Sequence, residues 1–246
     1  RRLKKLGITL HLEHRAEAFE AGEPTVVVAR GPAGEALRLE ADLVMVTVGR
    51  LPNTENLGLE AAGVAVDGKG FITVDDRQRT SAPGIYAIGD VAGGALLAHK
   101  AYQEAKVAAE VIAGEPAAFD NAVPAVIYTD PEVAWVGLGE EEARGLGHEV
   151  VTGTFPFSAS GRAMSLDSTD GFVKVVADAA SKRLLGVVAV GRGVSELVAE
   201  GTLALEMGAF LEDLALTIHP HPTMSEALQE AVEAALGRAV HTLNKN

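Results

Sequence analysis

The chain has 246 residues and a formal net charge of −13, from 34 acidic and 21 basic residues. Hydrophobic residues make up 48% of it, enough for substantial cores in two or three domains. The acidic balance argues against non-specific binding to nucleic acid, which depends on positive charge. No uninterrupted apolar run reaches the roughly 18 residues that a membrane span needs, so we expect no membrane partner.

The sequence contains no cysteine. Structural disulfides, thiolate metal sites and a redox-active dithiol are therefore excluded within these residues, and we expect no metal site. The chain starts with Arg1 rather than Met, and the run from Arg1 to Gly7 resembles the last turns of a helix with a glycine C-cap. We therefore expect a fragment that starts inside a domain, and we expect it to be cytoplasmic.

Residues 1–50 have the pattern of the end of a nucleotide-binding α/β domain. Alternating or apolar runs predict strands over 8–12, 25–28 and 36–39, with a Gly-Pro-Ala-Gly turn between the last two. A longer apolar run predicts a buried strand over 43–48, which leads into Gly49 and Arg50. Residues 51–121 are then expected to form part of a second, central domain.

In the central segment, strands are predicted over 71–74 and 85–88, and a helix from about Leu96 to Ala113. The second strand delivers Gly89 and Asp90 to the carboxyl end of a sheet, where ligands bind in α/β folds. Glycine permits close approach of a ligand, and the carboxylate can accept hydrogen bonds from sugar or ribityl hydroxyls. The alternative is that Asp90 is a solvated turn residue.

Residues 122–246 are expected to form an α+β domain with an antiparallel sheet. Short strands are predicted over 125–128, 133–136, 150–155, 172–176 and 184–190. Helices are predicted over about 140–144, 195–207 and 224–236. The fold class is therefore α/β followed by α+β.

The segment His219-Pro220-His221-Pro222-Thr223-Met224-Ser225-Glu226 carries the most specific chemistry. Two prolines restrict the backbone around His221, and one X-Pro bond could be cis. A rigid histidine with a carboxylate beside it is suited to proton transfer near neutral pH. The alternative is structural: Thr223 and Glu226 match a helix capping box, which would leave the histidines as loop residues.

The run Thr80 to Asp90 resembles the second flavin-binding motif of the pyridine nucleotide–disulphide oxidoreductases. Leu96-Leu97-Ala98-His99 is similar to the helix start that meets the isoalloxazine ring in that family, mainly through backbone contacts. The resemblance therefore implies FAD binding by Asp90, Leu96, Leu97, Ala98 and His99.

The run Val46 to Thr54 is similar to the crossover from the nicotinamide domain to the flavin domain of the same family. The resemblance implies that Gly49 lies close to NAD and that Ala16, just past the first strand, lies near its adenine. The run Tyr128 to Gly137 resembles the start of the interface domain. These implications give three parts: NAD domain 1–50, FAD domain 51–121 and dimerisation domain 122–246.

The His219–Glu226 signature resembles that of the family branch that oxidises dihydrolipoamide. This implies that His221 is the catalytic histidine and Glu226 its carboxylate partner, in a homodimer that uses FAD and NAD. It also implies that the substrate is carried by the acyltransferase of a 2-oxo acid dehydrogenase complex, and that the redox cysteines lie outside this chain. Alternatives are a glutathione or mercuric reductase-like enzyme, or a non-catalytic dimerisation and docking module.

Overall fold

The computed structural model describes residues 2–244. The chain divides into two compact units, with the boundary between Leu51 and Pro52. Each unit is described by itself.

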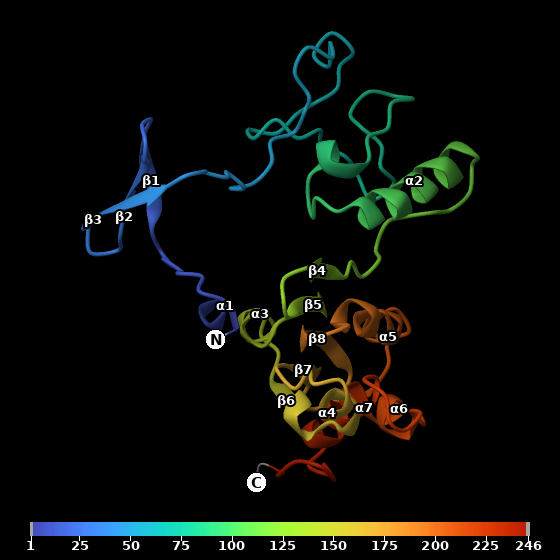
Figure 1. Cartoon of the computed structure of the whole chain (residues 1–246). Coiled ribbons are helices and arrows are strands. Elements are labelled where there is room, and N and C mark those ends of the chain that lie inside the picture. The colour runs from blue at the N-terminus through green and yellow to red at the C-terminus, as the bar shows by residue number, and fades with distance from the viewer. Residues whose placement is uncertain (1, 245–246) are drawn as a thin grey trace. The chain divides into compact units, whose positions relative to one another are not determined.

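The first unit is built around a three-stranded antiparallel sheet (Figure 1). A short helix, α1 (Arg2–Lys5), precedes strands β1 (Arg15–Glu20), β2 (Thr25–Arg30) and β3 (Ala36–Ala41). The order is β1-β2-β3, so each strand pairs with its neighbour in sequence. The strands predicted over 25–28 and 36–39 are confirmed.

Two predictions for the first unit are wrong. Residues 8–12 form no strand, and the first strand begins instead at Arg15, where it pairs with β2. Residues 43–48 also form no strand, and Leu43 and Val48 are 85% and 92% exposed. A strand needs a hydrogen-bonded neighbour, and among the described residues no strand pairs with either segment.

The second unit begins with loops around a small core. Val64, Ile72, Ala82 and Ala87 are buried together. The strands predicted over 71–74 and 85–88 are reduced to isolated bridges, Val66 with Ile72 and Arg79 with Tyr86, because neither segment has a continuous ladder partner among the described residues.

A 3-10 turn, η1 (Gly89–Ala92), and a long helix, α2 (Ala98–Ile112), follow these loops. The predicted helix is confirmed, with its start moved from Leu96 to Ala98. Residues after α2 lead without regular structure to the next strand at Ala125.

Residues from Ala125 onward contain a five-stranded antiparallel sheet of order β4-β5-β8-β7-β6 (Figure 1). Its strands are β4 (Ala125–Ile127), β5 (Glu132–Gly137), β6 (Val150–Pro156), β7 (Phe172–Asp178) and β8 (Leu184–Gly191). All five predicted strands and the antiparallel pairing are confirmed.

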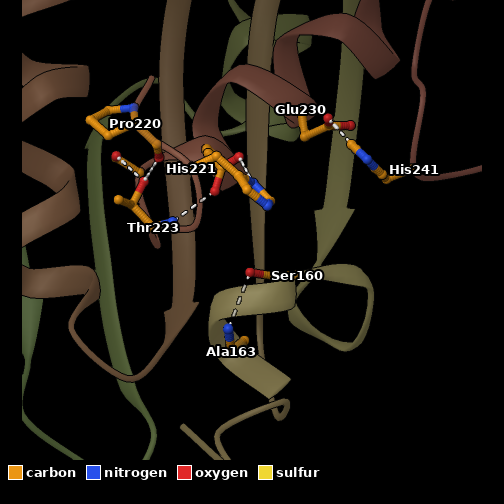
Figure 2. Close-up of polar contacts among 9 residues, drawn as sticks. Ser160, Ala163, Pro220, His221, Thr223, Glu230 and His241 are labelled. Atoms are coloured by element: carbon orange, nitrogen blue, oxygen red, sulfur yellow. Dashed lines mark hydrogen bonds and ion pairs between the residues drawn. The ribbon is translucent and has the colours of Figure 1, made fainter. Parts of the chain in front are cut away.

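Helices cover this sheet: α3 (Glu140–Gly145), α4 (Gly161–Ser165), α5 (Val194–Glu206), α6 (Leu211–Leu216) and α7 (Glu226–Ala235). Helix α5 packs on β5 and β8, α7 packs on β6 and β7, and α6 packs on α7. Their apolar faces form one core with the sheet, in which Phe157, Leu211 and Leu228 are fully buried. Helices α4 and α6 are too short to show a clear helical period in the sequence, and α4 is capped by the Ser160 hydroxyl (Figure 2).

No helix within residues 2–244 is long and apolar enough to cross a membrane. The division of the chain at residues 50 and 121 into three domains stays a prediction.

Candidate functional site

The segment between α6 and α7 brings His221 and Glu226 together. Nδ1 of His221 lies 2.8 Å from Oε1 of Glu226 (Figure 2). The His221 side chain is 76% exposed, and its Nε2 has no hydrogen-bond partner among the described residues. An ionised carboxylate only accepts hydrogen bonds, so this contact places the proton on Nδ1 and leaves the Nε2 lone pair facing outward.

The predicted capping box is half formed. The backbone N–H of Thr223 donates to Oε2 of Glu226 at 2.7 Å, as expected. The Thr223 hydroxyl, however, donates to the carbonyl of Pro220 and contacts the hydroxyl of Ser225, and α7 begins at Glu226. The structural and catalytic interpretations of Glu226 are therefore compatible, because one carboxylate oxygen fixes the backbone and the other faces His221.

The electrostatics keep Glu226 ionised. Burial raises the pKa of its carboxyl, but the Thr223 N–H and the His221 ring lower it by more, and the net shift is downward. The carboxylate is therefore available as an acceptor for His221. The peptide bond between His221 and Pro222 is cis, which the sequence allowed for.

The predicted flavin-contacting residues lie in η1 and at the start of α2. Asp90 is exposed in η1, and Gly89, which precedes it, is buried with a φ of +74°. Leu97 is the N-cap of α2 and makes no side-chain hydrogen bond, and the first turn contains no acidic residue. Ala98 and His99 are exposed at this end, and the His99 ring contacts the carbonyl of Pro124.

These residues fit a flavin. The helix N-terminus presents its unpaired N–H groups without a competing side chain, which suits an electron-rich ring edge. A Cβ at Gly89 would lie 3.3 Å from the Cβ of Ala101, in a backbone conformation that favours glycine. Gly89, which precedes Asp90, therefore packs against the first turn of α2.

A buried ion pair that was not predicted from the sequence lies beneath the η1 turn. Nζ of Lys100 lies 2.6 Å from Oε1 of Glu104, and their side chains are only 5% and 6% exposed. Oε2 of Glu104 accepts the backbone N–H of Gly89 at 2.7 Å. The only available signal was the i, i+4 spacing of opposite charges, which in most helices marks a solvated face.

The predicted nicotinamide-side residues lie in the first unit. Gly49 is exposed with a φ of +132°, which fits a position that favours glycine. Ala16 lies inside β1, opposite Ala29, rather than just past a strand, because the strand expected over 8–12 does not form. Among the described residues, no hydrogen bond joins Gly49 to Ala16.

Two protein families match the chain. Residues 1–105 match the model of the pyridine nucleotide-disulphide oxidoreductases, and residues 123–232 match the model of the dimerisation domain of the same enzymes.

Relatives and solved structures agree with these matches. Dihydrolipoyl dehydrogenase of Thermus scotoductus is 54% identical over 99% of this chain and 53% of its own length, and that of Halobacterium salinarum is 52% identical over 99% of this chain and 52% of its own. LpdA of Mycobacterium tuberculosis superposes with a TM-score of 0.84 at 28% identity, over 94% of this chain and 50% of its own. The HOCl-induced flavoprotein disulfide reductase RclA of Escherichia coli superposes with a TM-score of 0.79 at 28% sequence identity. The match covers 89% of this chain and 50% of that protein.

The matches define a class of oxidoreductases that carry a dimerisation domain. The chain belongs to the pyridine nucleotide–disulphide oxidoreductase family, and the predicted fold class is confirmed. It spans about half the length of the curated relatives that it matches.

Proposed function

We propose that this chain is the C-terminal half of a dihydrolipoyl dehydrogenase, and that His221 is its proton-transfer residue. The observation that carries the proposal is the 2.8 Å contact between the exposed His221 ring and Glu226. The identity of 54% and 52% to two dihydrolipoyl dehydrogenases supports the choice of substrate class.

His221 acts through Nε2. Its outward lone pair accepts the thiol proton of dihydrolipoamide, because the thiolate rather than the thiol attacks a disulfide. The carboxylate of Glu226 keeps the other ring nitrogen protonated and provides a counter-charge for the imidazolium that forms. The disulfide must come from outside this chain, which contains no cysteine.

FAD and NAD are the cofactors of this family. When bound, they supply the electron-accepting chemistry that carries the reducing equivalents away from the dithiol. The residues of this chain that would hold FAD are Asp90 and the helix start at Leu96, Leu97, Ala98 and His99. Gly49 and Ala16 would lie against NAD.

The proposed active form is a homodimer in which the partner subunit receives His221. The match of residues 123–232 to a dimerisation domain supports it. So do four large exposed apolar side chains: Leu203 on α5, Met207 just after α5, Leu216 at the end of α6 and Ile218 in the loop that follows. Docking to the acyltransferase of a 2-oxo acid dehydrogenase complex and a cytoplasmic location stay predictions.

The test is His221→Gln in the complete flavoenzyme, with His241→Gln as the matched control. His241 is also an exposed histidine that contacts a carboxylate, Glu230, on α7 (Figure 2). Loss of the base should lower dihydrolipoamide turnover by roughly 10²- to 10⁴-fold, while flavin absorbance and NADH-to-dye activity persist. Unchanged turnover in the His221 variant would remove His221 from the mechanism.

A second experiment tests the 246-residue chain by itself. With FAD, NADH and lipoamide supplied, it should show no lipoamide-dependent oxidation of NADH, because it has no dithiol. Robust turnover by this chain alone would overturn the proposed division of the active site.

A further inference from the structure

The other histidine of the segment, His219, has the opposite environment to His221. Its side chain is only 5% exposed. Nε2 lies 2.7 Å from Oε1 of Glu200, and Nδ1 lies 2.9 Å from the backbone carbonyl of Thr217. One histidine of the pair therefore points outward, and the other is enclosed between two oxygen atoms.

One of these oxygens belongs to a backbone carbonyl, which determines how the ring is held. A carbonyl never donates, so Nδ1 of His219 carries a proton and donates it to Thr217. The other ring nitrogen, Nε2, makes the second contact, at 2.7 Å from Oε1 of Glu200. The ring therefore contacts its own segment at Thr217 and helix α5 at Glu200.

Glu200 offers a rigid point of attachment. It lies on α5, whose inner face is buried in the main core through Val194, Val198 and Ala204. The next residue, Gly201, sits so close to β8 that an added Cβ would lie 3.0 Å from the Val187 side chain. Helix α5 is therefore packed tightly against the sheet. Because His219 is hydrogen-bonded to Glu200 on this helix, the position of His219 relative to the sheet is fixed as well.

The contacts on the two sides of His221 complement each other. On the C-terminal side, Thr223 is held by Glu226 and Pro220. On the N-terminal side, the described side-chain contact that joins the segment to another part of the fold is that of His219 with Glu200. His221 lies between these two anchors.

We propose that His219 and Glu200 are positioning residues that hold His221 at the correct place for proton transfer. The inference rests on the proposed function of His221. If the contact between His219 and Glu200 is removed, the segment keeps its contacts with α7. It then loses the side-chain contact that fixes its position relative to α5 and the sheet. A displacement of about 1 Å at a reacting group can cost on the order of 10²-fold in rate.

The experiment uses the complete flavoenzyme with Glu200→Ala, His219→Leu and His219→Gln, and Glu196→Ala as the matched control. Glu196 is an exposed carboxylate on the same helix. Turnover with dihydrolipoamide, its KM, NADH-to-dye activity and dimer mass are measured for each. A glutamine side chain can still donate an N–H to Glu200, whereas leucine cannot.

A positioning role requires that kcat falls by roughly 10- to 100-fold in Glu200→Ala and His219→Leu. KM and dye activity should stay within about twofold of the parent, the dimer mass should be unchanged, and His219→Gln should recover part of the lost kcat. The Glu196 control should match the parent.

Two results would overturn the inference while His221→Gln remains inactive and the proposed function stands. One is kcat within twofold of the parent in both Glu200→Ala and His219→Leu. The other is a parallel loss of both activities and of the dimer, without recovery by glutamine, which shows a structural role alone. If His221→Gln itself retains turnover, the proposed function fails and this inference fails with it.

Discussion

The buried ion pair of Lys100 and Glu104 should stabilise the turn that carries Asp90. Glu104 contacts both the Lys100 ammonium, at 2.6 Å, and the backbone N–H of buried Gly89, at 2.7 Å. Replacing Glu104 with leucine leaves the Gly89 N–H without its acceptor and the buried Lys100 ammonium without its counter-ion, with its long 3.5 Å contact to the carbonyl of Gly89 retained. Replacing Lys100 with methionine leaves the carboxylate buried without its counter-ion.

Breaking a buried ion pair from one side costs about 3–5 kcal/mol, because the remaining charge is uncompensated. In the double variant Lys100→Met with Glu104→Leu, both charges are gone. The Gly89 N–H loses its acceptor, which costs about 1–3 kcal/mol, and the Gly89 carbonyl loses a long 3.5 Å contact with Lys100. The double variant should therefore be more stable than either single variant. Additivity would instead make it the least stable of the three.

Amide hydrogen exchange in α2 measures this local stability, since it reports opening below the global transition. At tenfold per 1.4 kcal/mol, Val107 and Val111 should exchange roughly a hundred- to several-thousand-fold faster in each single variant. Glu110→Leu, at an exposed position of the same helix, is the control and should change exchange less than about threefold. Two results would contradict this prediction: single variants that exchange like the control, or a double variant whose amides exchange faster than those of both single variants.

Two further predictions concern α7. Gly153→Ala should destabilise the C-terminal domain by about 1–3 kcal/mol in urea unfolding, because the new Cβ would lie 2.0 Å from the carbonyl of Ala231 and force α7 away from β6; an unchanged midpoint would contradict this. The pKa of Glu226 is lowered from its usual 4.5 by folding, so its stabilising contribution is present above that pH and is lost as pH falls through the folded pKa. The difference in unfolding free energy between the parent and Glu226→Gln should therefore shrink as pH falls below about 4.5, and a difference that stays constant would count against this linkage.

The sequence alone determined most of the C-terminal domain. Its strands alternate or run apolar between clear turn signals, and their partners all lie within residues 125–191, so local pattern and tertiary pairing agree. The pairing of His221 with Glu226 was also predictable, because prolines and a helix start five residues on leave little freedom between them. The FAD and NAD contacts of Asp90, the helix start at Leu96, Gly49 and Ala16 stay predictions.

Tertiary structure decided what depends on distant partners. The apolar run 43–48 has the sequence pattern of a strand, but no strand pairs with it among the described residues. A strand needs a hydrogen-bonded neighbour, and the tertiary fold decides whether that neighbour is present. His219 and Glu200 are 19 residues apart and meet only because α5 and the segment before α7 pack on one core. The sequence therefore predicted His221 and Glu226 as neighbours, and only the structure showed that His219, beside them in the segment, meets Glu200 on α5.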